Sequence, residues 1–207
     1  MGCDIHIHVE YKVLVKGRKK WQCGDYFMLN PYYGTNDYEK EKYSVVDFCG
    51  DRNYLLFSVL ADVRNYADNA YISEPRGLPA DISKEVKAIA KDWGEDGHSH
   101  SYLTLQELLD FQKNIPPLRH KGMISPEAQK ALDEKGITPD MYCQGTNAKG
   151  WEWREWAEEN TVLLPLIEAL KQRADELYLI CNFLWDKDFK KAYELSKDIR
   201  IVFWFDN

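Results

Sequence analysis

The first twelve residues constrain the fold of this chain more than any other stretch. Successive side chains of a β-strand point to opposite faces, and apolar and polar residues alternate here. The odd positions are apolar or aromatic: Cys3, Ile5, Ile7, Val9 and Tyr11. The even positions place two imidazoles between two carboxylates: Asp4, His6, His8 and Glu10. The pattern predicts a strand with one face on a core and a second face that carries chemistry.

The last residues form a second strongly constrained segment. Residues 199–207 are Ile-Arg-Ile-Val-Phe-Trp-Phe-Asp-Asn, a run rich in the β-branched and aromatic residues that favour strands. A terminal strand this apolar favours the inside of a sheet over an exposed edge. We therefore expect it to pair with the first strand, which would bring Asp206 close to Asp4 or His6.

The sequence between these strands predicts one hairpin and several helices. The first strand, over residues 3–15, turns at Gly17, and residues 21–23 begin a return strand. Apolar spacing and capping residues favour helices at about 52–67, 83–91, 104–111, 125–136, 152–178 and 188–196. Residues 92–101 are rich in turn formers and are expected to be a loop. We predict a single α+β domain over residues 1–207, a mixed or antiparallel sheet with both terminal strands central and helices packed on it.

Composition and charge exclude several classes of function. The net charge of −7 argues against broad nucleic-acid binding, which needs a basic surface. The five cysteines are odd in number and form no CxxC pair, which is typical of reduced thiols inside a cell. No apolar run reaches membrane-spanning length and no signal peptide is present. These features favour a cytoplasmic protein that does not bind membranes.

Four of the five histidines form two His-x-His pairs, His6 with His8 and His98 with His100. Imidazole is the commonest metal ligand near neutral pH, and Zn²⁺ takes nitrogen ligands in a tetrahedron. The two pairs therefore predict that these four histidines bind a divalent metal, with zinc as the favoured ion. In the alternative interpretation, the first pair lies on a solvated strand face and the second stabilises a tight turn.

A metal at these histidines would polarise a substrate and activate a water molecule. Asp4 and Asp96 are then the candidate catalytic carboxylates, because either could act as a general base. Guanidinium groups match phosphate oxygens, so Arg52, Arg64 and Arg76 are candidates to hold an anionic substrate such as a phosphate or a nucleotide.

Two further stretches have a structural and a functional interpretation. Residues 24–50 are rich in loop formers and carry scattered tyrosines, and they either fold onto the core or form a lid over a pocket. The dense basic run at residues 16–20 is expected to be a solvated hairpin turn.

The segment from Asp4 to His8, Asp-Ile-His-Ile-His, resembles the Asp-x-His-x-His that opens the first strand of amidohydrolase-type and PHP-type metal hydrolases. The resemblance implies that His6 and His8 are metal ligands, with Asp4 beside them. It covers five residues only, and the chain is short for a complete (β/α)₈ barrel. We therefore expect this chain to share the metal chemistry of these hydrolases but not their fold.

A second resemblance covers more of the chain. Its motifs are the opening Met-Gly-Cys-Asp-Ile-His and the segments 51–65, 73–79, 92–105 and 202–207. Together they resemble a family of small proteins encoded by bacteriophages and prophages. The resemblance implies a phage accessory protein that acts inside a bacterial host cell.

Two functions from different classes follow from these observations. The first is a metal-dependent hydrolase that acts on a phosphate- or nucleotide-containing substrate. The second is a non-enzymatic phage protein that binds a host protein or a signalling nucleotide, as an inhibitor of host defence or a ligand sponge, through its tyrosines and arginines. A third alternative is an interaction domain whose histidines have only structural roles.

Overall fold

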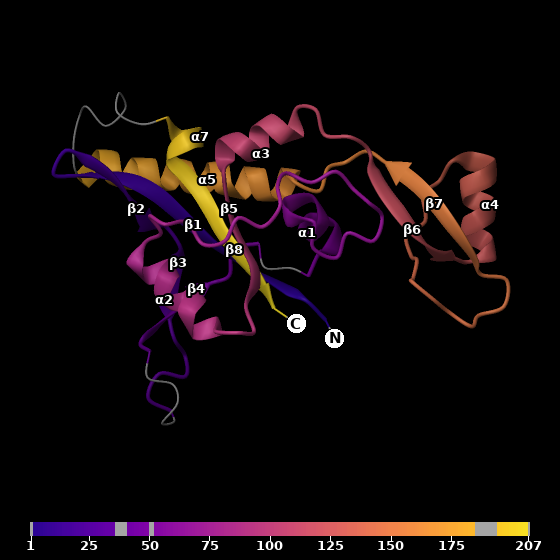
Figure 1. Cartoon of the computed structure of the whole chain (residues 1–207), viewed down its shortest axis with the longest axis horizontal. Helices are drawn as coiled ribbons and strands as arrows, with labels where there is room; N and C mark the ends of the chain where they lie inside the picture. Colours follow the sequence, from indigo (N-terminus) through magenta and orange to yellow (C-terminus); the bar gives the residue numbers. More distant parts are fainter. Residues whose placement is uncertain (1, 36–40, 50–51, 185–193, 207) are drawn as a thin grey trace.

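The central sheet is built from both ends of the chain, as the sequence predicts. The computed structural model describes residues 2–35, 41–49, 52–184 and 194–206, and Figure 1 shows the course of the chain. The sheet is antiparallel with the strand order β2-β1-β8-β5. Its strands are β1 (Asp4–Val15), β2 (Arg18–Cys23), β5 (His98–Thr104) and β8 (Ile199–Asp206). The prediction of an α+β fold with both terminal strands central is therefore confirmed.

The pairing of β1 with β8 places chemically active residues side by side. Asp4 lies opposite Asp206, and His6 lies opposite Trp204. This register confirms the expected approach of Asp206 to Asp4 and His6. The predicted hairpin from β1 to β2 is also present, and it turns through Lys16 and Gly17, both with positive φ.

The odd-numbered face of β1 and β8 forms the main core. The helices that pack on it are α1 (Tyr54–Ala61), α3 (Leu105–Gln112) and α5 (Leu164–Leu184). The strand residues of this core are almost fully buried and apolar: Ile5, Ile7, Val9, Ile201, Phe203 and Phe205. This face therefore supplies most of the apolar burial that stabilises the sheet.

The even-numbered face is covered by α2 (Lys84–Trp93). Val86 and Ala90 of this helix pack on Val202 and Trp204 of β8. The first turn of α2 is capped by Ser83, whose side chain accepts a hydrogen bond from the Val86 N–H. The polar row of β1 is partly exposed at Asp4 and His6 and buried at His8 and Glu10.

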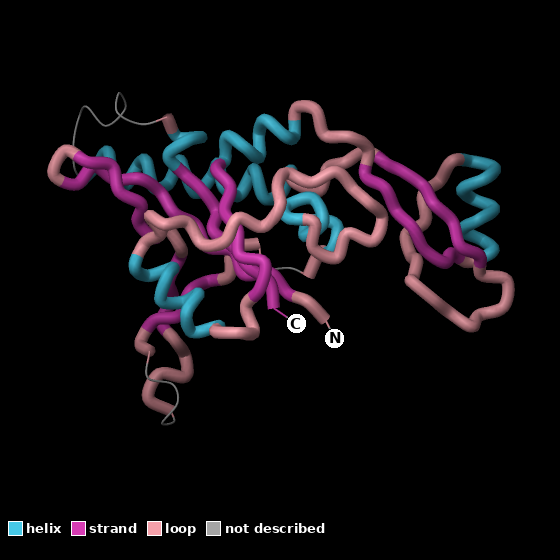
Figure 2. Tube along the Cα trace, in the orientation of Figure 1, coloured by secondary structure: helices cyan, strands magenta, loops and turns pink. Residues whose placement is uncertain are grey.

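Two smaller hairpins extend from the sheet. One consists of β3 (Tyr26–Leu29) and β4 (Tyr43–Val46), so part of the predicted loop over residues 24–50 is a strand pair. The other consists of β6 (Leu118–Ile124) and β7 (Glu152–Glu158), with α4 (Pro126–Lys135) between them. Figure 2 shows this second hairpin and α4 set apart from the elements around the central sheet.

Several predicted helix boundaries were wrong, each for a local reason. The predicted helix over 152–178 is strand β7 followed by α5, which starts at Leu164 with Pro165 in its first turn. The predicted helix over 52–67 is the shorter α1, which is capped by Asn53 and ends where Asp62 adopts a left-handed conformation. Part of the predicted loop over 92–101 belongs to β5.

The last predicted helix, over 188–196, lies partly outside the described residues, which contain α7 (Leu195–Asp198). Among the described residues, no helix combines the length and apolar character that a membrane crossing needs.

Candidate histidine cleft

A cleft of about 300 Å³ opens on the polar face of β1 beside the C-terminal half of α2. We call it the histidine cleft, and it is lined by His6, Ile7, His8, Val45, Asp47, Ile89 and Trp93. Three elements meet here, because β1 supplies the histidines, α2 supplies Trp93, and β4 with the residue after it supplies Val45 and Asp47. The cleft is just large enough for a small ligand or part of a larger one.

His8 is held by a buried carboxylate. Its Nδ1 lies 2.8 Å from Oδ2 of Asp25, and the other oxygen of Asp25 accepts a 2.6 Å hydrogen bond from the Val9 N–H. Both His8 and Asp25 are buried. Because the carboxylate accepts a hydrogen bond, the proton of a neutral His8 lies on Nδ1 and Nε2 is left as the basic nitrogen.

His6 is held in the same way by the other end of the chain. Its Nε2 lies 3.3 Å from Oδ2 of Asp206, whose Oδ1 accepts a 3.0 Å hydrogen bond from the Asp4 N–H. The indole of Trp93 packs on the imidazole with the ring centroids 4.0 Å apart. The two neighbouring histidines therefore each have one nitrogen fixed by a carboxylate, and both line one cleft.

Trp204 is buried and packs against these imidazoles from behind the residues that line the cleft. Its ring stacks on His8 at a centroid distance of 4.7 Å and lies 6.1 Å from the ring of His6. Its indole nitrogen is buried and has no hydrogen-bond partner among the described residues. A buried donor without a partner is costly to the stability of the fold.

Asp4 is engaged by an arginine. Arg52 donates two hydrogen bonds to its carboxylate, Nε to Oδ1 at 2.7 Å and Nη2 to Oδ2 at 2.6 Å. These hydrogen bonds from Arg52 hold the pKa of Asp4 below its ordinary value. The structure thus places Asp4 next to His6 along the polar row, with both of its oxygens already paired.

The remaining polar candidates lie elsewhere. Arg64 donates to the hydroxyl of Tyr66 at 3.4 Å, and Arg76 donates to the carboxylate of Glu107 at 2.7 Å. Asp96 is exposed in the turn after α2, where its N–H donates to the carbonyl of Trp93. The lining of the histidine cleft includes none of Arg64, Arg76 and Asp96.

The second histidine pair is divided by an irregularity in β5. The register of β5 on β8 shifts between His98 and Ser101, and Ser99 has a φ of 52°. As a result, the His98 ring lies 6.1 Å from Phe205 on the core face. The His100 ring lies 5.6 Å from Trp204 on the opposite, polar face.

The four histidines are therefore not gathered around one point. His100 shares the polar face with His6, but Trp204 on β8 lies between their strands. Burial lowers the pKa of His100, and the neighbouring His98 lowers it further. Among the described residues, no three His, Cys, Asp or Glu side chains are arranged as a metal site.

The histidine cleft does carry donors of the kind that a divalent metal takes. His6 and His8 present nitrogen atoms, and the carboxylate of Asp47 lines the same space. A carboxylate on the second nitrogen of a ligating histidine is a common way to fix its tautomer and orientation. Asp25 and Asp206 occupy such positions.

The sequence did not point to Asp25, Asp47 or Trp204 as partners of these histidines. The first two are isolated in loop segments, and no local pattern links them to β1. Trp93 could have been found, because Val86, Ala90 and Trp93 recur at helical spacing and extend the predicted helix beyond Lys91.

Comparisons with known proteins give no further identification. No protein-family model, curated protein sequence or solved structure matches this chain.

Proposed function

We propose that this protein is a hydrolase that acts on a small phosphate- or nucleotide-containing substrate in the histidine cleft. The observation that carries the proposal is that His6 and His8 line one cleft and each has one ring nitrogen fixed by a carboxylate. Such imidazole–carboxylate pairs are typical of groups that move protons in catalysis.

In this proposal the two imidazoles have separate tasks. Nε2 of His8 would take a proton from a water molecule while the water oxygen attacks the phosphorus atom. The bond from phosphorus to the leaving oxygen would break, and His6 would donate a proton to that oxygen. Trp93 also lines the cleft, and an aromatic side chain suits a nucleobase or another planar group.

A divalent metal such as Zn²⁺ belongs to an alternative form of this proposal, because a ring nitrogen that binds a metal cannot also transfer a proton. In that form the free nitrogens of His6 and His8 would hold the ion with Asp47 after these side chains rearrange, since they do not form a metal site as they stand, and Asp25 and Asp206 would orient the imidazoles. When bound, the ion would supply Lewis acidity toward the phosphoryl group. The resemblance to phage-encoded proteins supports a setting inside an infected bacterium, where the substrate would be a nucleotide of the host.

The test is a hydrolysis assay with nucleoside mono-, di- and triphosphates and an activated phosphodiester, each with and without Zn²⁺, Mn²⁺ or Mg²⁺. The wild-type protein is expected to release product. His8→Gln and His6→Gln should each lower turnover by about 10²-fold or more, because a positioned acid or base contributes about 10² to 10⁴. Elemental analysis of the same samples tests whether metal is lost with the histidines.

The matched control is His100→Gln, which removes an imidazole from the same sheet face outside the histidine cleft. It should retain turnover within about threefold of the wild type. The proposal fails if the wild type hydrolyses none of these substrates with any of the metals. It also fails if the two cleft variants are as active as the control.

A second candidate is a non-enzymatic binding protein that recognises a host protein. Apolar and aromatic side chains of hairpin β3–β4 are exposed to solvent: Tyr26, Phe27, Met28, Leu29, Tyr43 and Val46. Contiguous exposed apolar surface of this kind often marks a protein–protein contact. A protein that lacks hydrolytic activity, but loses a host partner when Phe27 and Leu29 are changed to serine, would favour this alternative.

A further inference from the structure

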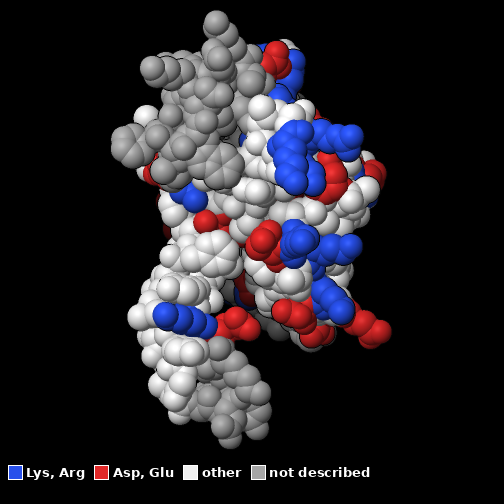
Figure 3. All heavy atoms as spheres, turned by 90° about the vertical axis from the view of Figure 1, so that its left-hand side faces the viewer, with Lys and Arg blue, Asp and Glu red and all other residues white. Residues whose placement is uncertain are grey.

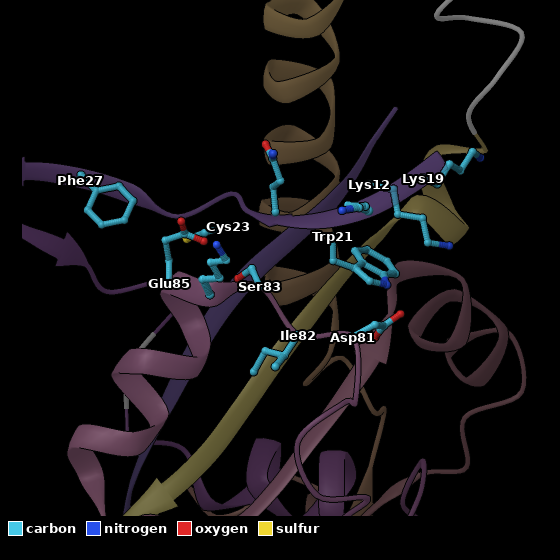
Figure 4. Close-up of a pocket in the computed structure, with 12 residues that line it drawn as sticks. Lys12, Lys19, Trp21, Cys23, Phe27, Asp81, Ile82, Ser83 and Glu85 are labelled. Carbon is cyan, nitrogen blue, oxygen red and sulfur yellow. The ribbon is translucent and has the colours of Figure 1, made fainter. Parts of the chain in front are cut away.

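A second and larger cavity lies at the opposite end of α2. Its volume is about 780 Å³, within the range of ligand-binding sites. The hairpin β1–β2 forms one wall and the segment that leads into α2 forms the other (Figure 4). We call it the lysine cavity, because four lysines line it: Lys12, Lys19, Lys20 and Lys84.

Among the described residues, two of these lysines form ion pairs and two do not. Lys12 and Lys19 lie 3.1 and 2.6 Å from the carboxylate of Asp198. Lys20 and Lys84 are exposed and form no ion pair with any residue that the structure describes. Figure 3 shows groups of lysine and arginine side chains on the side of the molecule that carries this hairpin.

The acidic residues around the lysine cavity balance most, but not all, of this charge. Arg200 is shared by Asp81 at 2.9 Å and Glu10 at 2.7 Å, and Glu85 is the other lining carboxylate. The four lysines and Arg200 thus face one carboxylate fewer, from Glu10, Asp81, Glu85 and Asp198. Cys23 also lines the cavity, and burial together with the charge of Asp25 raises its pKa to about 12. The thiol therefore adds no negative charge at neutral pH.

The walls of the lysine cavity are held by buried polar contacts. Trp21 lies under the guanidinium of Arg200, which is 4.0 Å from its ring centroid. Arg200 is bound to buried Glu10 at 2.7 Å, and Glu10 accepts a 2.6 Å hydrogen bond from the Ser83 N–H. These contacts join β1, β8 and the start of α2, so the cavity is a preorganised feature of the fold.

The lysine cavity and the histidine cleft lie along the same helix. Residues 82–85 line the first, and Ile89 and Trp93 line the second. With a rise of 1.5 Å per residue, the step from Lys84 to Trp93 is about 14 Å. Phe27 lines the first space, Val45 lines the second, and these two residues are directly opposite each other on β3 and β4.

The histidine cleft by itself is a poor place for phosphate charge. Its lining includes the carboxylate of Asp47 and no lysine or arginine, and Asp25 and Asp206 stand behind its histidines. A phosphate-containing substrate therefore needs a source of positive charge nearby. The lysine cavity supplies that charge at the other end of the same helix.

We infer that the lysine cavity binds the terminal phosphate groups of an extended substrate whose nucleobase and reacting phosphorus atom occupy the histidine cleft. The inference rests on the proposed function and narrows the substrate class to molecules about 14 Å long with several negative charges at one end. Nucleoside polyphosphates and dinucleotides belong to this class. Lys20 and Lys84 provide the main contacts, because ammonium groups bind phosphate as point charges.

The experiment measures the binding of inorganic tripolyphosphate to the full chain by titration calorimetry. The wild type should bind it, with an affinity that falls as salt is added. The variant K20Q/K84Q should bind at least about tenfold more weakly. Both lysines are exposed, so this variant should fold normally. The matched control K149Q/K171Q removes the same charge from two exposed lysines that do not line this cavity and should bind like the wild type.

The outcomes separate this inference from the proposed function. Binding that depends on Lys20 and Lys84 and persists in H6Q/H8Q supports the lysine cavity, whether or not hydrolysis is seen. The inference is overturned if K20Q/K84Q and K149Q/K171Q bind tripolyphosphate with equal affinity. It is also overturned if the wild type does not bind tripolyphosphate. If the wild type is an active hydrolase, K20Q/K84Q should raise KM for a nucleoside triphosphate with kcat unchanged. An unchanged KM would overturn the inference while the proposed function stands.

Discussion

The two faces of the central sheet are made by the same strands and differ in almost every physical property. On the odd-numbered face, Phe203 and Phe205 are fully buried among apolar residues from three helices. On the even-numbered face, His8, Glu10 and Arg200 are equally buried, but each is paired with an oppositely charged or hydrogen-bonding group. Because successive side chains of a strand point to opposite faces, the same two strands carry an apolar core on one face and a row of polar groups on the other.

This difference teaches that burial alone does not separate structural from functional residues in this protein. The apolar face is stabilised by the removal of apolar surface from water. The polar face costs desolvation and is tolerated because its charges are paired. Changes on the first face should affect stability and leave the chemistry of the cleft intact, and the opposite should hold for the histidines.

The largest expected effect is the loss of stability on the apolar face. Phe203→Ala should lower the free energy of unfolding by about 3–5 kcal/mol, because it leaves a cavity at a fully buried site. Denaturant unfolding followed by tryptophan fluorescence measures this change. Leu14→Ala, at a position that is 49% exposed, is the control and should change it by about 0.5 kcal/mol or less. Similar effects of the two variants would contradict the assignment of the core.

A somewhat smaller loss is expected for the buried ion pair of the polar face. Glu10→Gln leaves Arg200 with a weaker partner and should cost about 3 kcal/mol. The double variant Glu10→Gln/Arg200→Met should recover part of this loss, since no unpaired charge is left in that position. A double variant whose loss equals the sum of the two single losses would show that the pair is not coupled.

The third effect depends on pH and concerns the ion pairs of Lys12 and Lys19 with Asp198. Burial alone would raise the pKa of Asp198, but hydrogen bonds from Lys19 and Lys12 outweigh it and hold that pKa below its ordinary value. A lowered carboxyl pKa stabilises the fold above the unfolded pKa of about 3.9, and the contribution disappears as pH falls through the folded value. Asp198→Asn should therefore cost about 1–2 kcal/mol at pH 7, and the cost should shrink as the pH falls below about 3.9. A penalty that grows on acidification would contradict this sign.

The smallest effect concerns His100. Burial lowers its pKa in the folded protein, so the unfolded chain binds a proton more readily at this position. The wild type should lose stability from this residue as pH falls through about 6.5, the ordinary value for histidine. His100→Gln should leave stability at pH 7 within about 0.5 kcal/mol and should remove that part of the acid dependence. This prediction is wrong if the free energies of unfolding of the wild type and His100→Gln change in parallel with pH.

The parts of the fold set by strong local patterns could be predicted from the sequence. Alternation defined β1, the apolar run defined β8, and the pairing of these two strands brought Asp206 to His6 as expected. The strand β7 was missed because Trp153 and Trp156 also fit a helical spacing, and its partner β6 lies far away in the sequence. No local pattern could report that pairing.

The candidate site could be predicted only in part for the same reason. His6 and His8 were identified from one strand, and they do share a cleft. The position of His98 and His100 depends on a bulge at Ser99, where a non-glycine residue with positive φ sends the two rings to opposite faces. The contact of His8 with Asp25 depends on the turn after β2, and the sequence gives no sign of it.

The comparison of the two faces is tested most directly by the histidine side-chain NMR spectrum, recorded without and with saturating ATP. The ring signals of His6 and His8 are expected to shift, because both residues line the cleft. The signals of His100 and of His120, which is stacked on Trp156 in the distant hairpin, should stay in place. The claim that the polar face of β1 is the functional face would be contradicted if the signals of His6 and His8 stay unchanged while those of other histidines shift. It would also be contradicted if no histidine signal responds to ATP.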